Sequence, residues 1–150
     1  MPQSLSSVLI HLVFSTKNRQ PFITPAIEPE LFKYLATELR NMDCPSLAIN
    51  GTTDNVHILF ALSRTMTIAN VVKSIKGSTS RWIKPRSPEL RSFEWQAGYG
   101  AFSIGRSQVG QVKRYLARQK VHHRKLSFQD EFRTLLLKYE IPYDEKYVWD

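Results

Sequence analysis

An apolar segment near the N-terminus limits the folds that are open to this chain. Residues 7–15 carry Val, Ile, Leu and Phe at both odd and even positions, so both faces of an extended strand here are apolar. Such a strand must be covered on both sides to escape water. We therefore expect it to lie centrally in a sheet.

Helical and strand patterns alternate along the rest of the chain. Thr67 is a suitable N-cap for a basic helix that Pro85 would end, and Ser107 is a suitable cap for a later helix. Asn50-Gly51 is typical of a two-residue hairpin turn. The expected helices cover residues 29–41, 68–83, 108–123 and 127–139. The expected strands cover residues 7–15, 45–50, 55–62, 93–96 and 98–104, and the last two form a second hairpin.

This order of elements contains the split βαβ layout of ferredoxin-like proteins. We expect an α+β fold, with an antiparallel sheet and helices mainly on one of its faces. The helix over residues 108–123 then lies near the C-terminus. The length of 150 residues suits one domain, and no repeat or linker interrupts it, so residues 1–150 are expected to form a single domain.

The net charge and the cysteine content limit the possible partners and the cellular compartment of the protein. A net charge of +8 favours a polyanionic partner, because Lys and Arg release counterions from a phosphate backbone; scattered surface lysines are the alternative. The single cysteine, Cys44, cannot form an internal disulfide, and the N-terminus lacks a signal-peptide pattern. No apolar run approaches the ~18 to 20 residues that cross a bilayer. We expect a cytoplasmic protein.

Two polar side chains share one face of the strand at residues 55–62. Val56, Ile58 and Phe60 point to one side, so Asn55 and His57 project together from the other. Both are candidate metal or phosphate contacts. A half-buried histidine with satisfied hydrogen bonds is the alternative, so a site here needs support from elsewhere in the chain.

The helix over residues 108–123 offers that support. Tyr115 and Gln119 are one helical turn apart, and His122 continues the same stripe. A phenol has a pKa of ~10 and needs a metal or a base to act as a nucleophile at neutral pH. A core tyrosine with its hydroxyl at the rim is the alternative.

The segment DNVHIL at residues 54–59 resembles the His-hydrophobic-His strand of the HUH single-tyrosine transposases of insertion sequences, to which REP-associated tyrosine transposases are related. Four further segments are similar to that family, in the same order: LIHLVFSTK at 9–17, VKSIKG at 72–77, GYGAFS at 98–103 and YLARQ at 115–119. The resemblance covers nearly the whole chain, and it includes the tyrosine helix.

The resemblance implies a DNA transposase that cuts and rejoins single-stranded DNA at hairpin-marked element ends. Tyr115 would attack a phosphodiester, form a 5′-phosphotyrosine link and free a 3′-hydroxyl. Mg²⁺ or Mn²⁺ would polarise the scissile phosphate. Family members hold this ion with both motif histidines and the glutamine that follows the tyrosine, and those positions are Asn55, His57 and Gln119 here. The family also implies a homodimer in which the tyrosine helix acts in trans, and a cytoplasmic protein that associates with the nucleoid through DNA.

Asn55 departs from the family, because its amide oxygen is a weaker, neutral ligand than an imidazole. Three interpretations follow. Asn55 serves as a ligand; or Asp54, His122 or His123 completes the site; or the protein binds DNA or RNA and cleaves weakly or not at all. Weakened but retained activity is the expectation.

Basic side chains lie along two of the expected helices and one loop. The candidate DNA contacts are Lys73, Lys76, Arg81, Trp82, Lys113, Arg114 and Arg118, with Lys17 and Arg19 in the loop after the first strand. Solvated helix faces and a core Trp82 are the alternative. An RNA-binding sheet is a rival function, but its exposed aromatics are not evident in the strand patterns. A metal-dependent phosphohydrolase is a second rival function, but the sequence has no Gly-rich phosphate-binding loop to support it.

Overall fold

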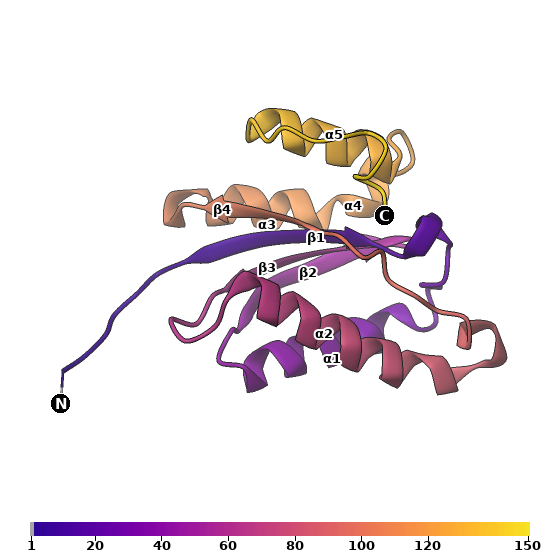
Figure 1. Ribbon diagram of the computed structural model, residues 1–150, viewed down its shortest axis with the longest axis horizontal. Helices are drawn as coiled ribbons and strands as arrows, with labels where there is room; N and C mark the ends of the chain where they lie inside the picture. Colours follow the sequence, from indigo (N-terminus) through magenta and orange to yellow (C-terminus); the bar gives the residue numbers. More distant parts are fainter. Residues whose placement is uncertain (1) are drawn as a thin grey trace.

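The computed structural model describes residues 2–150 as a four-stranded sheet between two layers of helices (Figure 1). The strands are β1 Leu9–Ser15, β2 Ser46–Thr52, β3 Asn55–Ala61 and β4 Gly100–Ile104. They lie in the order β2-β3-β1-β4, and every neighbouring pair is antiparallel. This is the ferredoxin-like order, and β1 is buried along its whole length in the interior of the sheet, as predicted.

The helices divide between the two faces of the sheet. They are α1 Glu28–Asn41, α2 Ile68–Ile83, α3 Val109–Ala117, α4 Gln119–His122 and α5 Phe128–Lys138, with short 3-10 turns η1 Lys17–Arg19, η2 Lys84–Arg86, η3 Pro88–Leu90 and η4 Arg106–Gln108. Figure 1 shows α1 and α2 under one face and α3, α4 and α5 over the other. The expected α+β class is confirmed, but the helices do not gather on one face. The second face needs its own cover because Leu9, Val13 and Leu59 make it apolar.

Local signals place α2 and α5 as the sequence predicted. The Thr67 hydroxyl accepts the N–H of Asn70 at 3.1 Å, and the Ser127 hydroxyl accepts the N–H of Asp130 at 3.2 Å. Both helices bury an apolar stripe against the sheet. Among residues 2–150, no helix combines the length and the apolar character that crossing a membrane requires.

The first hairpin turns later than predicted. Asn50 and Gly51 lie inside β2, opposite His57 and Val56, and the turn falls at residues 53–54. The Asn50 side chain donates to the Leu116 carbonyl at 2.8 Å, which ties β2 to α3. A Cβ on Gly51 would lie 2.2 Å from the Asn55 carbonyl, so this glycine permits a close approach of two backbones. The predicted Asn50-Gly51 turn was therefore wrong.

Residues 93–96 do not form the predicted strand. Their only ladder contact is an isolated bridge between Thr16 and Trp95, and β4 pairs with β1 instead. Phe93 and Trp95 are both buried in the main core, with their rings edge to face at 4.7 Å. Tertiary packing of the two rings replaces the expected second hairpin.

The helix predicted over residues 108–123 is broken. Arg118 separates α3 from α4 with φ −101° and ψ 12°. Ser107 is not its cap; instead the Gln108 side chain accepts the Gly105 N–H at 2.9 Å. The break lets the residues after Arg118 turn toward α5, where the candidate site lies.

Candidate active site

His57 occupies the centre of a polar cluster between the sheet and α5. Its side chain is fully buried on the face opposite Val56 and Ile58, as the alternation predicted. Its Nδ1 lies 2.9 Å from Nε2 of His11 on β1, and its Nε2 lies 3.0 Å from Oε1 of Glu131 on α5. Both ring nitrogens are therefore engaged inside the protein.

Glu131 collects hydrogen bonds from two further helices. The Tyr115 hydroxyl and the Gln119 amide both donate to its Oε2, the latter at 3.0 Å. His123 Nε2 lies 2.8 Å from its Oε1. With His57, four side chains from β3, α3, α4 and the turn after α4 meet one carboxylate that is 2 % exposed.

Sequence reasoning missed Glu131. Phe128, Phe132 and Leu135 form the buried stripe of α5, and Glu131 lies on that same face. A carboxylate within an apolar helical stripe is an available signal, because an acidic side chain is almost never buried without partners.

The electrostatics of the cluster stabilise an ionised carboxylate and a protonated phenol. Burial by itself raises the pKa of Glu131, but hydrogen bonds from His123, His57 and Tyr115 and the charge of His57 outweigh it and hold that pKa well below its usual range. Burial, with the Glu131 charge and hydrogen bond, raises the pKa of Tyr115 well above its usual range. A phenol in this state can act as a nucleophile only when its proton is removed or its oxygen is polarised.

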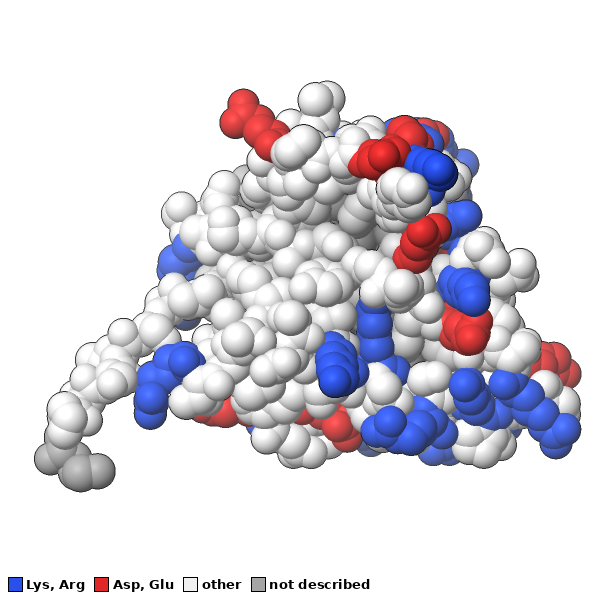
Figure 2. Space-filling view, viewed as in Figure 1, with Lys and Arg blue, Asp and Glu red and all other residues white. Residues whose placement is uncertain are grey.

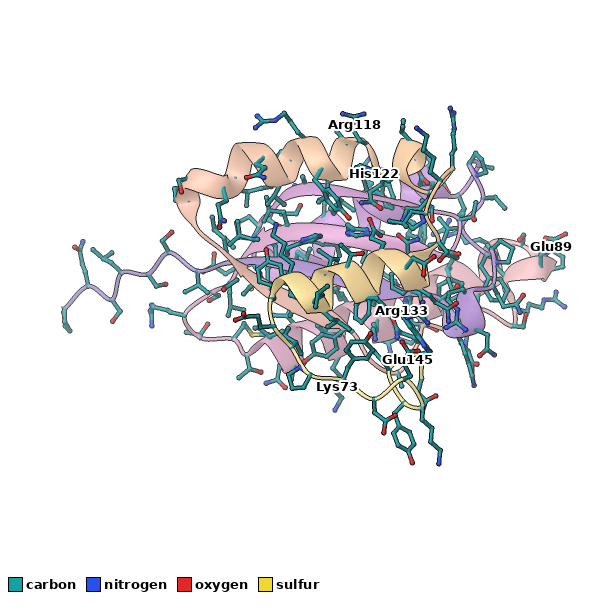
Figure 3. The ribbon with its side chains drawn as sticks, turned by 90° about the horizontal axis from the view of Figure 1, so that it is seen from above. Lys73, Glu89, Arg118, His122, Arg133 and Glu145 are labelled. Carbon is teal, nitrogen blue, oxygen red and sulfur yellow. The ribbon has the colours of Figure 1, made fainter. Side chains whose placement is uncertain are left out.

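His11 is neutral in this setting. Burial, followed by the neighbouring His57, lowers its pKa to about 3. His122 contributes differently from His123: its ring lies against the Tyr115 ring, with centroids 5.0 Å apart. Figure 3 shows His122 on the side of the α3 and α4 layer that faces α5, while Arg118 points outward on the other side.

The donor set fits a divalent cation. One ligand atom each from His57, His123 and Glu131 lie within 4.8 Å of one another. Among the described residues, the Asn55 Oδ1 and the Gln119 Oε1 are buried and have no hydrogen-bond partner. Unpaired buried amide oxygens are costly, and oxygen is the ligand type that hard divalent cations take. Two imidazoles, a carboxylate and amide oxygens suit Mn²⁺ or Mg²⁺.

The amide group of Asn55 is directed by its neighbours. Its Nδ2 donates to the Thr52 hydroxyl and to the Asp54 carboxylate, each at 2.6 Å. Because both N–H donors of the amide are used in the turn, its Oδ1 faces the other way and has no hydrogen-bond partner within the part of the chain that the structure describes. Asp54 thus orients Asn55.

The predicted DNA contacts fall into two groups on different faces of the sheet. Lys113, Arg114 and Arg118 are exposed on and directly after α3. Lys17, Lys73 and Lys76 line a groove of about 780 Å³ beside α2, together with Lys84 and with the aromatic rings of Tyr99 and Trp149. In Figure 2, Lys and Arg gather over α2 and the turn that follows it.

Some of these side chains already have protein partners. Lys17 pairs with Glu94 at 3.2 Å, and Lys76 donates to the Gln96 carbonyl at 2.8 Å. Trp82 is partly buried against the main core and stacks on Tyr34, with centroids 4.9 Å apart. Arg81 and Trp82 do not line the groove, and Arg19 lies 5.9 Å from the Trp149 ring.

Two solved structures share this fold. A candidate transposase from Deinococcus radiodurans aligns with a TM-score of 0.62 at 20% identity, over 79% of this chain and 98% of that one. A REP-associated tyrosine transposase bound to a REP hairpin aligns with a TM-score of 0.62 at 13% identity, over 82% of this chain and 72% of that one. No curated protein sequence matches the chain. The fold is thus one that transposases use.

The sequence places the chain within that class. Residues 4–119 match the family described as IS200-like transposases. The chain therefore belongs to the IS200-like transposase family. The match ends at Gln119, so His123 and Glu131, which complete the polar cluster, lie beyond the matched segment.

Proposed function

We propose that the protein cuts and rejoins single-stranded DNA through Tyr115, at hairpin-marked ends of a mobile element. The observation that carries this proposal is the meeting of the Tyr115 hydroxyl and two imidazoles, His57 and His123, at the single carboxylate of Glu131. A tyrosine with a purely structural role does not require two imidazoles at the carboxylate that accepts its hydroxyl. Membership of a transposase family supports DNA as the substrate.

Tyr115 and Glu131 divide the chemistry of cleavage. The phenolic oxygen bonds to phosphorus. As this bond forms, the phenolic O–H becomes acidic, and its proton passes to the Glu131 carboxylate that already accepts it in a hydrogen bond. The bond from phosphorus to the 3′-oxygen breaks, and this oxygen takes a proton from water to become a 3′-hydroxyl. The DNA remains joined to Tyr115 through its 5′-phosphate. Rejoining is the reverse reaction, with a 3′-hydroxyl as the nucleophile.

His57, His123 and Glu131 are proposed to hold Mg²⁺ or Mn²⁺, with Gln119 and Asn55 as amide ligands. A bound divalent ion neutralises charge on the scissile phosphate and polarises it. Without such a charge, the ionised Glu131 would repel the phosphodiester that Tyr115 must reach. Glu131 thus supplies the anionic ligand that the amide of Asn55 cannot.

The groove beside α2 is proposed as a DNA-binding surface. Its lysines suit phosphates, and the rings of Tyr99 and Trp149 offer surfaces on which bases can stack. The structural neighbour bound to a REP hairpin supports a hairpin ligand. Ser15 pairs with Asn55, so the strand end that leads to Lys17 lies beside the candidate metal site.

The homodimer with the tyrosine helix acting in trans remains part of the proposal. In one chain, Tyr115 already lies near its own His57, with ring centroids 6.0 Å apart. Action in trans therefore requires α3 to leave β2 and dock on the partner. The break at Arg118 is the place where the chain would bend, because its φ and ψ already depart from helical values.

A binding-only protein is the second candidate function, because Asn55 replaces a motif histidine. An RNA-binding sheet is not favoured: helices cover both of the sheet faces, which leaves no open strand face for bases to stack on.

Covalent capture of DNA tests the proposal. Purified protein is mixed with labelled single-stranded hairpin DNA and Mn²⁺ or Mg²⁺, and adducts are resolved on a denaturing gel. We expect an adduct that Tyr115→Phe abolishes and that Tyr143→Phe, at an exposed tyrosine outside the cluster, preserves. Tight hairpin binding without an adduct would establish the binding-only function instead.

A further inference from the structure

His11 lies behind His57 and away from the other candidate ligands. It projects from β1 on the same face as His57 on β3, is 3 % exposed, and its Nε2 is 2.9 Å from the His57 Nδ1. The nearest other aromatic rings are those of Phe102 and Tyr115, with centroids 6.1 Å away in edge-to-face orientation. Among the described residues, the hydrogen bond to His57 is the one side-chain hydrogen bond of His11.

When a cation is bound, the number of protons on the two rings determines which of His11 and His57 donates in the hydrogen bond between them. A neutral imidazole carries one N–H, and a nitrogen that binds a metal must offer its lone pair. The His57 Nε2 lies 3.0 Å from the Glu131 Oε1, and both residues belong to the group whose ligand atoms lie within 4.8 Å of one another. If that atom binds the cation, the proton of His57 resides on Nδ1. The Nδ1–H then points at His11 Nε2, which must be the acceptor.

We propose that His11 is a positioning residue, which accepts the His57 Nδ1–H and thereby fixes the tautomer and ring orientation of His57 for a divalent cation. This inference rests on the metal site of the proposed function. Metal-bound histidines usually donate their second N–H to a carboxylate, a backbone carbonyl or water. Here the neighbouring strand supplies a neutral imidazole instead, which adds no charge to the site.

The location of His11 makes this role specific. β1 is central and buried on both faces, so no water is at hand to accept the His57 proton if His11 is removed. An apolar side chain at position 11 would leave a buried N–H unpaired, and it would permit the opposite tautomer, which cannot bind a metal through Nε2. A glutamine at position 11 can present an amide oxygen in place of the His11 Nε2.

The first test measures Mn²⁺ affinity by electron paramagnetic resonance in the absence of DNA. We expect His11→Leu to weaken binding roughly 10- to 100-fold, as loss of an outer-shell partner does, and His11→Gln to restore most of the affinity. Ile10→Val is the matched control, because Ile10 precedes His11 on β1 and packs in the core on the opposite face of the sheet. Its Mn²⁺ affinity should equal that of the unchanged protein. Equal affinity in His11→Leu would overturn the inference.

A second measurement does not depend on any variant folding. In ¹⁵N-histidine-labelled protein with Mg²⁺, long-range ¹H–¹⁵N spectra report which nitrogen of each ring is protonated. We expect the proton of His57 on Nδ1 and the proton of His11 on Nδ1. A His57 ring protonated on Nε2 with Mg²⁺ bound would contradict the inference.

The two proposals fail in distinguishable ways. If the protein binds Mn²⁺ but forms no DNA adduct, cleavage through Tyr115 fails, whereas the affinity of His11→Leu still decides the role of His11. If the unchanged protein binds no Mn²⁺, the role of His11 is overturned, whatever the DNA experiment gives.

Discussion

At the scale of single residues, Glu131 is the group on which the site depends. It hydrogen-bonds the proposed nucleophile through one oxygen and two imidazoles through the other. A buried carboxylate with four partners is held in one orientation, so both its basicity and its position are fixed by the fold.

Replacing Glu131 with glutamine keeps the size of the side chain and removes its charge. We expect Glu131→Gln to lower the rate of DNA adduct formation roughly 10²- to 10⁴-fold, the range that a positioned base contributes. The matched control is Asp130→Asn, at the exposed neighbouring position on α5. Denaturing gels of timed reactions give both rates. Equal rates for Glu131→Gln and the unchanged protein would remove Glu131 from the mechanism.

Asn55 is the second residue at which the proposed metal site can be tested. Asn55→His restores an imidazole, a stronger ligand than an amide oxygen, at the strand position beside His57. We expect tighter Mn²⁺ binding and faster adduct formation, measured by titration and by gel. Unchanged values for both would show that Asn55 lies outside the metal shell.

At the scale of elements, α5 matters because it delivers Glu131 to the sheet. Phe132, one residue further along α5, packs over β4 at Gly100, where a Cβ would lie 2.6 Å from the ring. Because Gly100 has no side chain, α5 can pack close to the strands, and this distance determines how near Glu131 lies to His57.

We expect Gly100→Ala to push α5 outward, to reduce the free energy of unfolding by about 1–3 kcal/mol, and to slow adduct formation. Gly105→Ala is the control: its Cβ would lie 3.4 Å from the Gln108 Oε1, an ordinary contact. Denaturant unfolding and gel assays of both variants make the comparison. Indistinguishable behaviour of the two alanine variants would show that contact with Phe132 does not position α5.

The C-terminal segment is tied to α5 by an ion pair. Arg133 donates to both oxygens of Glu145, at 2.6 and 3.1 Å, and Trp149 donates to one of them; Figure 3 shows Arg133 and Glu145 side by side. Hydrogen bonds from Arg133 and then Trp149 lower the pKa of Glu145 to about 2. The folded pKa lies below the ordinary value of 4.5, so this contact stabilises fully above about pH 4.5 and is lost as the pH falls toward 2.

The ¹⁹F signal of 5-fluorotryptophan at position 149 should therefore shift across this acidic window. Glu145→Gln should show the shifted signal already at pH 7, because the ion pair is absent at every pH. If the ¹⁹F signal changes neither with acidic pH nor in Glu145→Gln, Glu145 does not hold the C-terminal segment on α5.

At the scale of the whole molecule, the sheet separates two surfaces. The candidate catalytic cluster lies between the strands and α5, whereas the groove lined by lysines lies beside α2. Binding and cleavage should therefore respond separately to substitutions in the two places.

Salt dependence tests the groove. We expect Lys73→Ala to weaken binding of single-stranded hairpin DNA and to reduce the slope of log affinity against log salt by about 0.7, the value for one lost phosphate contact on a single strand. Arg40→Ala, at the exposed end of α1, should leave the slope unchanged. Fluorescence anisotropy over a range of salt concentrations gives these slopes. An unchanged slope for Lys73→Ala would place the phosphates elsewhere.

The sequence by itself determined the elements with strong local patterns. The two apolar faces of residues 7–15 predicted the interior position of β1, and alternation predicted that Asn55 and His57 share a face. The Thr67 cap predicted the start of α2, and the helix expected over residues 127–139 corresponds to α5. These features depend on neighbours a few residues apart, so periodicity and capping are enough to predict them.

Only the tertiary structure decided the hairpin turn after Gly51, the packing of residues 93–96 and the break at Arg118. It also brought Glu131 to His57, 74 residues away in the chain. Local patterns state which face of a helix is apolar, but they do not state which strand that face will cover. A buried carboxylate finds its partners only when α5 packs on the sheet, and that packing depends on long-range shape complementarity.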